Sequence, residues 1–351
     1  MTNVLVTGGA GYIGSHTCKA LAQAGYLPVT YDNLTRGHEW AVKWGPLERG
    51  DLLDATRLSE VLAMYRPEAV IHLAALAYVG ESVSEPAKYY RNNVVGTLNL
   101  LDVMRRAGID KIVFSSTCAT YGVPESVPII EEMSQQPINP YGASKLMIER
   151  ILSDYADAYG LEVVSLRYFN AAGADPAGEV GEEHDPETHL IPLVLQAAAG
   201  ARPHVTVFGD DYDTPDGTCI RDYVHVSDLA SAHVLAMRAL GRGDLRCAHN
   251  LGTGRGHSVA EVIDVARRMT GCDIRVVPGP RRPGDPAELF ADPTLANDHL
   301  GWVPQHALSG MIDSAWCWSR RSLEDSNTAR IADKRIAKRE TPKYGPSSCQ
   351  R

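Results

Sequence analysis

The 351-residue sequence predicts an α/β protein with a doubly wound parallel sheet and a smaller, loop-rich C-terminal lobe. Short apolar runs alternate with longer, more charged stretches throughout the first half of the chain. A glycine-rich segment follows the first of these runs, and glycine, proline and aspartate become frequent after about residue 170. Short buried strands separated by helices form parallel sheets covered on both faces, and such sheets bind ligands at the carboxyl ends of their strands.

The elements of this sheet follow one another in chain order. Five short runs are apolar and largely β-branched, which is typical of buried strands. They cover residues 4–6, 28–31, 69–73, 112–114 and 163–166. The longer segments between them are expected to be helices, over residues 12–25, 54–65, 89–107 and 142–159.

The second half of the chain is expected to form the smaller lobe. Strands become sparse there, and the loop-forming residues gather at 173–187 and 209–218. We therefore assign residues 1–172 to a first domain and residues 173–318 to the second lobe. The helical pattern of residues 226–240 indicates that the segment 222–252 returns to the first domain.

Composition argues against several classes of protein. A net charge of −9 is unlike the basic footprint of a nucleic-acid binder. No apolar run approaches the ~20 residues of a membrane span, and the chain enters a strand at once, without a signal sequence. The seven cysteines are scattered without a CxxC pair, so we expect reduced thiols in a cytoplasmic protein and no metal. Residues 319–351 are predicted to be a disordered tail, because apolar residues thin out and basic ones dominate.

A nucleotide-binding loop is predicted between the first strand and the first helix. Residues 7–14 read TGGAGYIG, and glycines there let the backbone approach a pyrophosphate whose charge rests on the helix N-terminus. Asp32 ends the second strand, where its carboxylate can accept hydrogen bonds from the adenosine ribose and repel a 2′-phosphate. The sequence therefore predicts a Rossmann domain that binds NAD in preference to NADP.

A tyrosine and a lysine form the expected catalytic pair. Tyr141 and Lys145 open a helix after Pro140, and their i, i+4 spacing puts the phenol and the ammonium on one face. A phenol that acts as a base at pH 7 needs its pKa lowered by about three units, or ~4 kcal/mol. A cation ~4 Å away at an effective dielectric of ~20 supplies about that much. A tyrosine and a lysine at this spacing are common on helix surfaces, so the hypothesis depends on the glycine loop upstream.

A third catalytic element is expected at the end of the fourth apolar strand. Residues 114–122 read FSSTCATYG, and they run from a strand into a loop where a substrate of an open α/β sheet lies. Thr117 can present its hydroxyl to a reacting substrate hydroxyl and to the tyrosine. Hydroxyls also cap turns, so this segment by itself leaves both interpretations open.

Together these segments resemble a known enzyme family. The motifs TGGAGYIGSHT, YDNL, SSTCATYG, NPYGASK, LRYFNAAGADP, DGTCIRDYVHVSDLA and RRPGD are similar to those of the UDP-glucose 4-epimerases, within the extended short-chain dehydrogenases/reductases. The similarity runs from residue 3 to about residue 318 and is strongest to the bacterial form that serves exopolysaccharide synthesis. It implies reversible epimerisation at C4 of a UDP-hexose through a 4-keto intermediate, with bound NAD and Tyr141 as the base. It also implies a homodimer.

The resemblance further implies the binding residues. The positions that match the family's NAD site are Gly8, Gly11, Tyr12, Ile13, Gly14, Asp32, Asn33, Asp51, Leu52, Leu73, Ala74, Ala75, Asn92, Lys145 and Phe169. The positions that match its UDP-sugar site are Thr117, Tyr141, Asn170, Leu190, Arg221, Arg282 and Asp285.

Two departures from the family leave the substrate and the cofactor affinity open. Ala77 replaces a lysine that some members place near the NAD phosphates, and this predicts weaker cofactor retention. Leu289 stands where some members carry a larger tyrosine beside the sugar 2-substituent, so UDP-N-acetylglucosamine and UDP-xylose or UDP-arabinose remain alternatives.

Two other functions compete with epimerisation. A 4,6-dehydratase or decarboxylase on this fold needs an additional acid after the active-site threonine, where this chain has Cys118 and Ala119. A non-catalytic NAD-binding regulator has no need of an intact Tyr–Lys pair.

Overall fold

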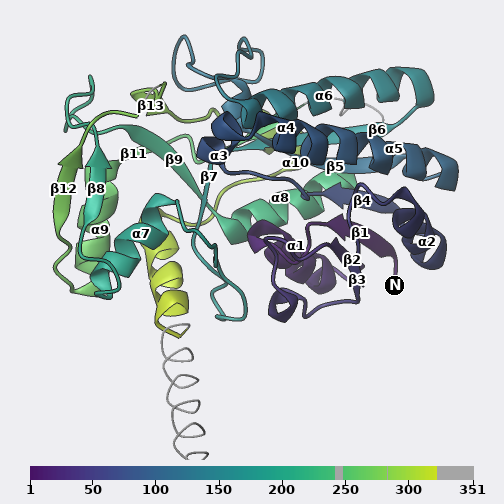
Figure 1. The fold of residues 1–351 in the computed structure, drawn as a ribbon, viewed down its shortest axis with the longest axis horizontal. Coiled ribbons are helices and arrows are strands. Elements are labelled where there is room, and N and C mark those ends of the chain that lie inside the picture. Colours follow the sequence, from purple (N-terminus) through teal and green to yellow (C-terminus); the bar gives the residue numbers. More distant parts are fainter. Residues whose placement is uncertain (242–247, 283, 322–351) are drawn as a thin grey trace, which may run out of the picture.

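The computed structural model describes residues 1–241, 248–282 and 284–321 (Figure 1). Its largest sheet contains β1 (Asn3–Thr7), β2 (Leu27–Asp32), β3 (Leu47–Arg49), β4 (Ala69–His72), β5 (Lys111–Thr117), β6 (Glu162–Tyr168) and β10 (Ala248–Leu251). The seven strands run in the order β10-β6-β5-β4-β1-β2-β3, and every pair is parallel. The chain reverses direction across the sheet between β1 and β4, so the predicted doubly wound fold is confirmed.

Helices cover both faces of this sheet because successive strand residues point to opposite sides. Val6 belongs to the apolar core of one face, whereas Leu5 belongs to the core of the other. The helices of the Val6 face are α1 (Tyr12–Gln23), α8 (Val226–Ala239) and α10 (Thr294–Leu300). The helices of the Leu5 face are α2 (Ala55–Tyr65), α5 (Gly96–Ala107) and α6 (Pro140–Tyr159). Figure 1 shows α5 and α6 on the opposite side of the sheet from α1 and α8.

The predicted helix over residues 89–107 is divided into three parts. A short α4 (Pro86–Tyr89) passes into a π-helical turn η2 (Tyr90–Val95) and then into α5. The helix α3 (Val79–Ser84) precedes them, and the 3₁₀ turns η1 (Glu39–Ala41) and η3 (Cys118–Thr120) lie in loops after β2 and β5. π-helical turns occur mostly within α-helices and often at functional sites. The turn η2 carries Asn92, one of the predicted cofactor residues.

The second lobe contains more strands than its composition indicates. A mixed sheet joins β7 (Asn170–Ala172), β9 (Ile220–His225), β11 (Gly256–Ser258) and β13 (Glu288–Leu289), and a second small sheet pairs β8 (Val205–Phe208) with β12 (Val276–Gly279). These strands are too short to stand out from their Gly- and Pro-rich surroundings. They share an apolar core with α7 (Leu190–Ala198), α9 (Val259–Thr270) and a helix over residues 308–321.

Two of the passages between the lobes have almost no connecting residues. The strand β6 ends at Tyr168 in the large sheet, and β7 begins at Asn170 in the second. The strand β9 ends at His225, and α8 begins at the next residue, Val226, and packs on α1.

The predicted tail begins inside a helix. Residues 319–321 continue the helix that starts at residue 308, and residues 322–351 lie outside the described part of the chain. Within the described ranges, no helix is long and apolar enough to cross a membrane.

Candidate active site

The glycine loop lies between β1 and the N-terminus of α1. Side chains larger than glycine would clash with the backbone at two of its positions. Gly8 has a positive φ of 73°, and a Cβ on it would lie 2.7 Å from the backbone nitrogen of Ala74. A Cβ on Gly14 would lie 2.1 Å from the carbonyl oxygen of Gly8. No side chain caps the helix at Gly11, so the amides of its first turn face the loop. These features fit a site where a pyrophosphate rests on the helix N-terminus.

The carboxylate of Asp32 lies at the end of β2, beside this loop. Its Oδ2 accepts a hydrogen bond from the backbone amide of Ala10 at 3.0 Å, and its Oδ1 accepts one from Leu34 at 2.8 Å. Burial raises the pKa of Asp32, and these two amide bonds oppose the shift. A carboxylate has about four acceptor positions, so two remain for the hydroxyls of a ribose. The residues present therefore fit the adenosine end of NAD.

Other predicted cofactor residues gather around the same sheet edge. Asn33 donates to Asp51 Oδ2 at 2.8 Å, so these two side chains form a pair beyond Asp32. Leu73 follows β4 and donates its backbone amide to Thr7 at 3.0 Å, which brings the segment 73–75 beside the glycine loop. Leu52 is buried beneath the start of α5.

A buried asparagine that the sequence did not single out fixes this region. Asn93 exchanges two hydrogen bonds with the backbone of Leu76, at 2.9 and 3.0 Å, and donates to the Ser144 hydroxyl at 3.1 Å. Its neighbour Asn92, the predicted residue, donates to the Asn93 side chain at 2.9 Å. Asn93 therefore ties the loop after β4 to α6, which carries Tyr141. Its position in a pair of asparagines was the only signal in the sequence.

The structure brings together the three predicted catalytic residues, Thr117, Tyr141 and Lys145. Thr117 ends β5, and Tyr141 and Lys145 lie in the first turns of α6, which Asn139 caps through the amide of Gly142 at 2.8 Å. All three side chains are buried. Lys145 Nζ donates to the carbonyl oxygen of Ser115 at 2.8 Å and lies 4.9 Å from the centre of the Phe114 ring. The lysine is thus anchored to the strand that ends in Thr117.

Burial, rather than the lysine charge, dominates the pKa values of this pair. Burial raises the pKa of Tyr141 well above its usual value, and a hydrogen bond with Thr117 opposes the shift. Burial lowers the pKa of Lys145 to about 7, and the charge of Glu149 opposes that shift. The sequence argument took Lys145 as a full positive charge at an effective dielectric of ~20 and did not include the burial of the two side chains. An oxidised nicotinamide, when bound nearby, would add a positive charge that lowers the pKa of Tyr141.

A buried ion pair lies one helical turn beyond Lys145. The guanidinium of Arg167 contacts Glu149 at 2.6 Å, and the two side chains are 7% and 10% exposed. Glu149 also accepts a hydrogen bond from the hydroxyl of Ser116, next to Thr117. Arg167 Nη1 donates to the Tyr121 hydroxyl at 2.8 Å. These contacts hold the end of β5 against α6, and no local motif in the sequence revealed them.

The predicted UDP residues of the second lobe lie on several elements, and only some of them contact one another. Arg221 of β9 forms an ion pair with Asp285, although 64 positions separate them. The Arg282 guanidinium lies over the Phe208 ring at 4.2 Å from its centre. Asn170 begins β7, next to Tyr223 of β9, and Leu190 begins α7. A ligand that engages Arg221 and Asp285 therefore finds them already paired.

The wall of the predicted sugar pocket is apolar. Phe169 and Cys118 are buried in one cluster, and Leu289 packs against it and pairs with Arg221 in the sheet register. Burial raises the pKa of the Cys118 thiol to about 12, so this side chain stays protonated at neutral pH. Ala77 is exposed after the loop that follows β4. The guanidinium of Arg36 lies nearby, 4.8 Å from the centre of the Tyr78 ring.

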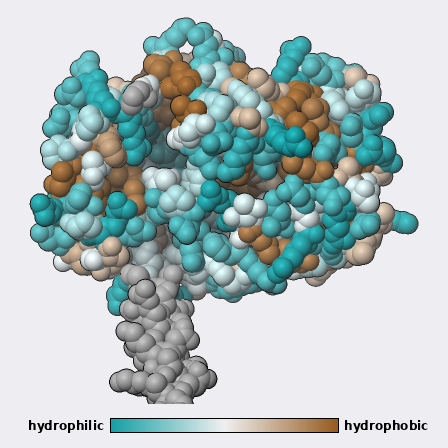
Figure 2. Space-filling view, viewed as in Figure 1, coloured by the Kyte–Doolittle hydropathy of each residue, from teal (hydrophilic) through white to brown (hydrophobic). Residues whose placement is uncertain are grey.

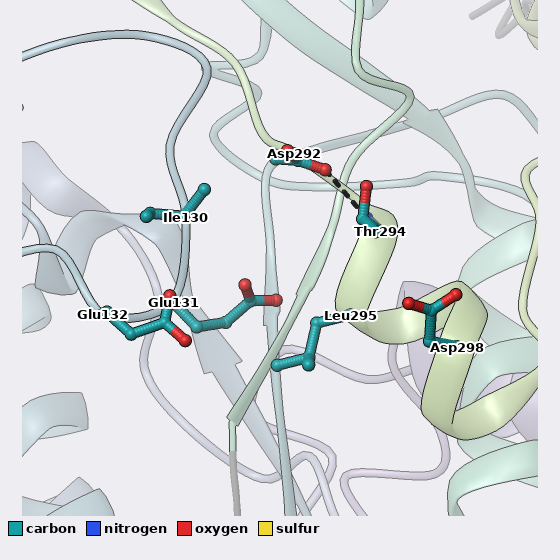
Figure 3. A pocket seen from close by; sticks show the side chains of 7 residues that line it. All are labelled: Ile130, Glu131, Glu132, Asp292, Thr294, Leu295 and Asp298. Carbon is teal, nitrogen blue, oxygen red and sulfur yellow. Dashed lines mark hydrogen bonds between the residues drawn. The ribbon is translucent and has the colours of Figure 1, made fainter.

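A separate acidic pocket of about 170 Å³ holds none of the predicted site residues (Figure 3). Its lining contains the four carboxylates of Glu131, Glu132, Asp292 and Asp298. The other lining residues are Ile130, Thr294 and Leu295. Glu131 accepts the backbone amide of Asn250 at 2.6 Å, so one of these carboxylates already stabilises the fold. This pocket is not the candidate active site.

The glycine loop, Asp32 and the Thr117–Tyr141–Lys145 group define a dinucleotide-dependent enzyme of the short-chain dehydrogenase type. The chain belongs to the NAD dependent epimerase/dehydratase family, whose model matches residues 4–252. It is 55% identical to the UDP-glucose 4-epimerase of Rhizobium meliloti (strain 1021) over 319 residues, which cover 91% of this chain and 97% of that protein. The resemblance read from the motifs is thereby confirmed.

Solved structures agree in fold. The UDP-glucose 4-epimerase from Brucella ovis in complex with NAD has a TM-score of 0.88 and 57% identity, covering 90% of this chain and 98% of that one. The UDP-glucose 4-epimerase from Bifidobacterium longum in complex with NAD⁺ and UDP has a TM-score of 0.87 and 41% identity, covering 91% and 98%.

Proposed function

We propose that this protein catalyses the reversible, NAD-dependent inversion at C4 of UDP-glucose and UDP-galactose. The observation that carries the proposal is the buried group of Thr117, Tyr141 and Lys145 at the carboxyl end of β5, beside a glycine loop that fits a dinucleotide. The relatives in Rhizobium meliloti and Brucella ovis, both named UDP-glucose 4-epimerase, support it.

In the proposed reaction, Tyr141 takes the proton from the sugar 4-hydroxyl while Thr117 shortens the proton path between them. Bound NAD supplies the reversible hydride acceptor that oxidation at C4 requires. Lys145, held by the Ser115 carbonyl, stabilises the phenolate and would hold the nicotinamide ribose when NAD is bound. The 4-keto sugar turns over in the site, C4 takes back the hydride on its opposite face, and Tyr141 returns the proton to the oxygen. The protonated thiol of Cys118 and the methyl of Ala119 offer no additional acid, which disfavours elimination or decarboxylation.

The binding residues are part of the proposal. We assign the NAD contacts to the residues that surround the glycine loop and its sheet edge: Gly8, Gly11, Tyr12, Ile13, Gly14, Asp32, Asn33, Asp51, Leu52, Leu73, Ala74, Ala75, Asn92, Lys145 and Phe169. We assign the UDP-sugar contacts to Thr117, Tyr141, Asn170, Leu190, Arg221, Arg282 and Asp285. A guanidinium suits diphosphate oxygens because it donates two parallel hydrogen bonds. Because Leu289 is smaller than the tyrosine that some members carry at this position, UDP-linked 2-acetamido sugars and UDP-pentoses remain alternative substrates.

Product analysis tests the reaction. Purified protein is mixed with UDP-galactose without added dinucleotide, and the nucleotide sugars are separated over time. An epimerase regenerates its cofactor in each cycle, so we expect UDP-glucose to accumulate over many turnovers. Arrest after one turnover would indicate a dehydrogenase, and no product at all would indicate a non-catalytic NAD-binding protein. Parallel assays with UDP-N-acetylgalactosamine and UDP-xylose identify the accepted sugar.

We further propose that the protein forms a homodimer through α5, α6 and the turn η2. A groove of about 370 Å³ is lined by four residues of η2 and one of α6: Tyr90, Arg91, Val94, Val95 and Met147. Figure 2 shows apolar side chains gathered on this side of the molecule. Val95 and Met147 are 44% and 46% exposed and lie in the same groove, where the apolar side chains of a second copy would cover them. Light scattering of the wild type and of M147E tests the assembly, and a monomeric wild type would contradict it.

We also propose a division of the chain into two domains, based on which sheet each segment joins. The dinucleotide-binding domain comprises residues 1 to about 170 and the segment that carries α8 and β10, and most of the remainder to residue 318 forms the substrate lobe. The cytoplasmic location remains a prediction.

A further inference from the structure

Four side chains with metal-binding atoms converge in the loop between β7 and α7. Glu182, His184, Glu187 and His189 lie within eight residues of one another, and their ligand atoms all lie within 4.8 Å. Nδ1 of His189 is 2.9 Å from an oxygen of each glutamate. Nδ1 of His184 is 3.2 Å from Glu182 and 3.6 Å from Glu187. None of these residues belongs to the proposed catalytic group.

The carboxylates of this cluster are buried together, which requires a compensating positive charge. The side chains of Glu182 and Glu187 are each 8% exposed. Two carboxylates this close in a poorly solvated place are unfavourable unless a cation or protonated neighbours balance them. A divalent cation supplies both charges at one point, whereas the alternative is a pair of protonated imidazoles.

The ligand atoms are held in place by contacts with other parts of the chain. Arg36 donates to the carbonyl of Asp185 at 2.6 Å, and Trp318 donates to that of Glu182 at 3.1 Å. Oε1 of Glu187 accepts the backbone amides of Thr188 and His189, at 2.7 and 2.8 Å. Such outer contacts orient ligands in metal sites, and both oxygens of Glu187 also face a histidine of the cluster.

One imidazole nitrogen in the cluster has no hydrogen bond. Nδ1 of His184 is buried and has no hydrogen-bond partner among the described residues, although it faces two carboxylates. The ring packs edge-on between Tyr12 and Tyr78, at centroid distances of 6.2 and 6.1 Å. The two tyrosines fix the orientation of the ring. This nitrogen makes ion-pair contacts with both carboxylates but no well-aligned hydrogen bond, and a metal ion between the three groups would satisfy all of them.

We infer that Glu182, His184, Glu187 and His189 bind one divalent transition-metal ion, and that zinc is the ion they suit best. Two imidazole nitrogens and two carboxylate oxygens are a donor set that zinc accepts in tetrahedral sites, whereas calcium and magnesium require oxygen ligands throughout. This inference departs from the prediction of no metal, which rested on the cysteines and did not weigh the pattern E-x-H-x-x-E-x-H.

The four protein ligands make this a closed, structural site. His184 contacts Tyr12 of the glycine loop, and Leu190 follows His189 at the start of α7. An ion here ties the loop 182–189 to the dinucleotide-binding edge of the large sheet. It takes no part in the epimerisation chemistry, so the inference stands or falls independently of the proposed function.

Metal content of the full-length protein, freed of any affinity tag, tests the inference. The protein is incubated with zinc chloride, passed through a desalting column and measured by mass spectrometry of the metal. The variants E182Q and H184Q remove one ligand each and keep the side-chain size. The matched control is E261Q, which removes a carboxylate 2.8 Å from a histidine, His257, in a pair outside the cluster. Circular dichroism establishes that each variant is folded.

We expect about one equivalent of zinc in the wild type and in E261Q, and at least a tenfold lower affinity in E182Q and H184Q. Cobalt(II) bound to the metal-free wild type should give the intense visible absorption of a tetrahedral site, and E182Q should lose it. Wild-type protein that retains no zinc or cobalt after desalting would overturn the inference and leave histidine–carboxylate ion pairs in its place. Equal zinc content in the wild type, E182Q and H184Q would also overturn it, because the metal would then lie elsewhere. If the variants do not fold, the wild-type stoichiometry and the cobalt spectrum decide the question.

Discussion

Replacing Lys145 by methionine should stabilise the cofactor-free protein at neutral pH, although the lysine is proposed to be essential for activity. Burial lowers the pKa of Lys145 from 10.5 to about 7. That shift corresponds to ~5 kcal/mol of unfavourable free energy for keeping the ammonium charged in the folded state. Loss of the hydrogen bond from Lys145 Nζ to the Ser115 carbonyl, 2.8 Å long, offsets ~1–3 kcal/mol of the gain.

The pH dependence separates these two contributions. Between about pH 7 and pH 10.5 the unfolded chain holds a proton on Lys145 that the folded chain has released, so the free energy of unfolding of the wild type rises with pH. The penalty is therefore fully present below pH 7 and fades as the pH approaches 10.5. The advantage of K145M should shrink by ~1.4 kcal/mol per pH unit over this range.

Urea denaturation of both proteins at several pH values from about 7 to 9 measures this difference. The substitution K88M, at a lysine whose side chain is 46% exposed, serves as the control for pH effects elsewhere in the chain. A difference between K145M and wild type that stays constant within ~0.5 kcal/mol across this range would refute the reasoning.

Three further predictions concern the site. Y141F should fold and retain NAD but lose epimerase activity by a factor of ~10²–10⁴ or more, and activity within tenfold of wild type would contradict the base assignment. E149Q should lower the free energy of unfolding by ~3–5 kcal/mol because it leaves Arg167 buried without its counter-ion. On the same helix, D154N, whose pair with Arg150 is 58% and 77% exposed, should cost less than ~1 kcal/mol, and equal losses would show that burial does not decide the effect. L289Y should slow turnover of a 2-acetamido sugar selectively, provided the wild type accepts one, and an equal effect on UDP-galactose would exclude a gating role.

The parts of the site that could be predicted from sequence are those in which the chemistry is local. The glycine loop and Asp32 belong to one strand–helix–strand unit, and Tyr141 and Lys145 share a single helical turn. Their residue types and spacings are dictated by contacts within a few residues, so the pattern alone carries the information.

The remainder depends on contacts between distant segments. Arg221 and Asp285 meet because β9 and β13 are neighbours in the second sheet, and Arg167 meets Glu149 because β6 lies beneath α6. The pKa values of Tyr141 and Lys145 depend on burial, which the spacing of two residues does not reveal. The short strands of the second lobe are set by pairing partners far away in the chain, and local composition there resembles a loop.

The way the chain joins its two lobes bears on how the sugar must move. A hinge needs residues that can absorb changes in backbone dihedral angles. Here one residue separates β6 from β7, none separates β9 from α8, and only residues 252–255 separate β10 from β11. The first two junctions leave almost no backbone to absorb a movement between the lobes, so we expect the lobes to keep their relative position there. We therefore expect the sugar to present its second face to the hydride donor by rotating about its own glycosidic and phosphate bonds. The space for this rotation is the space that the folded protein leaves.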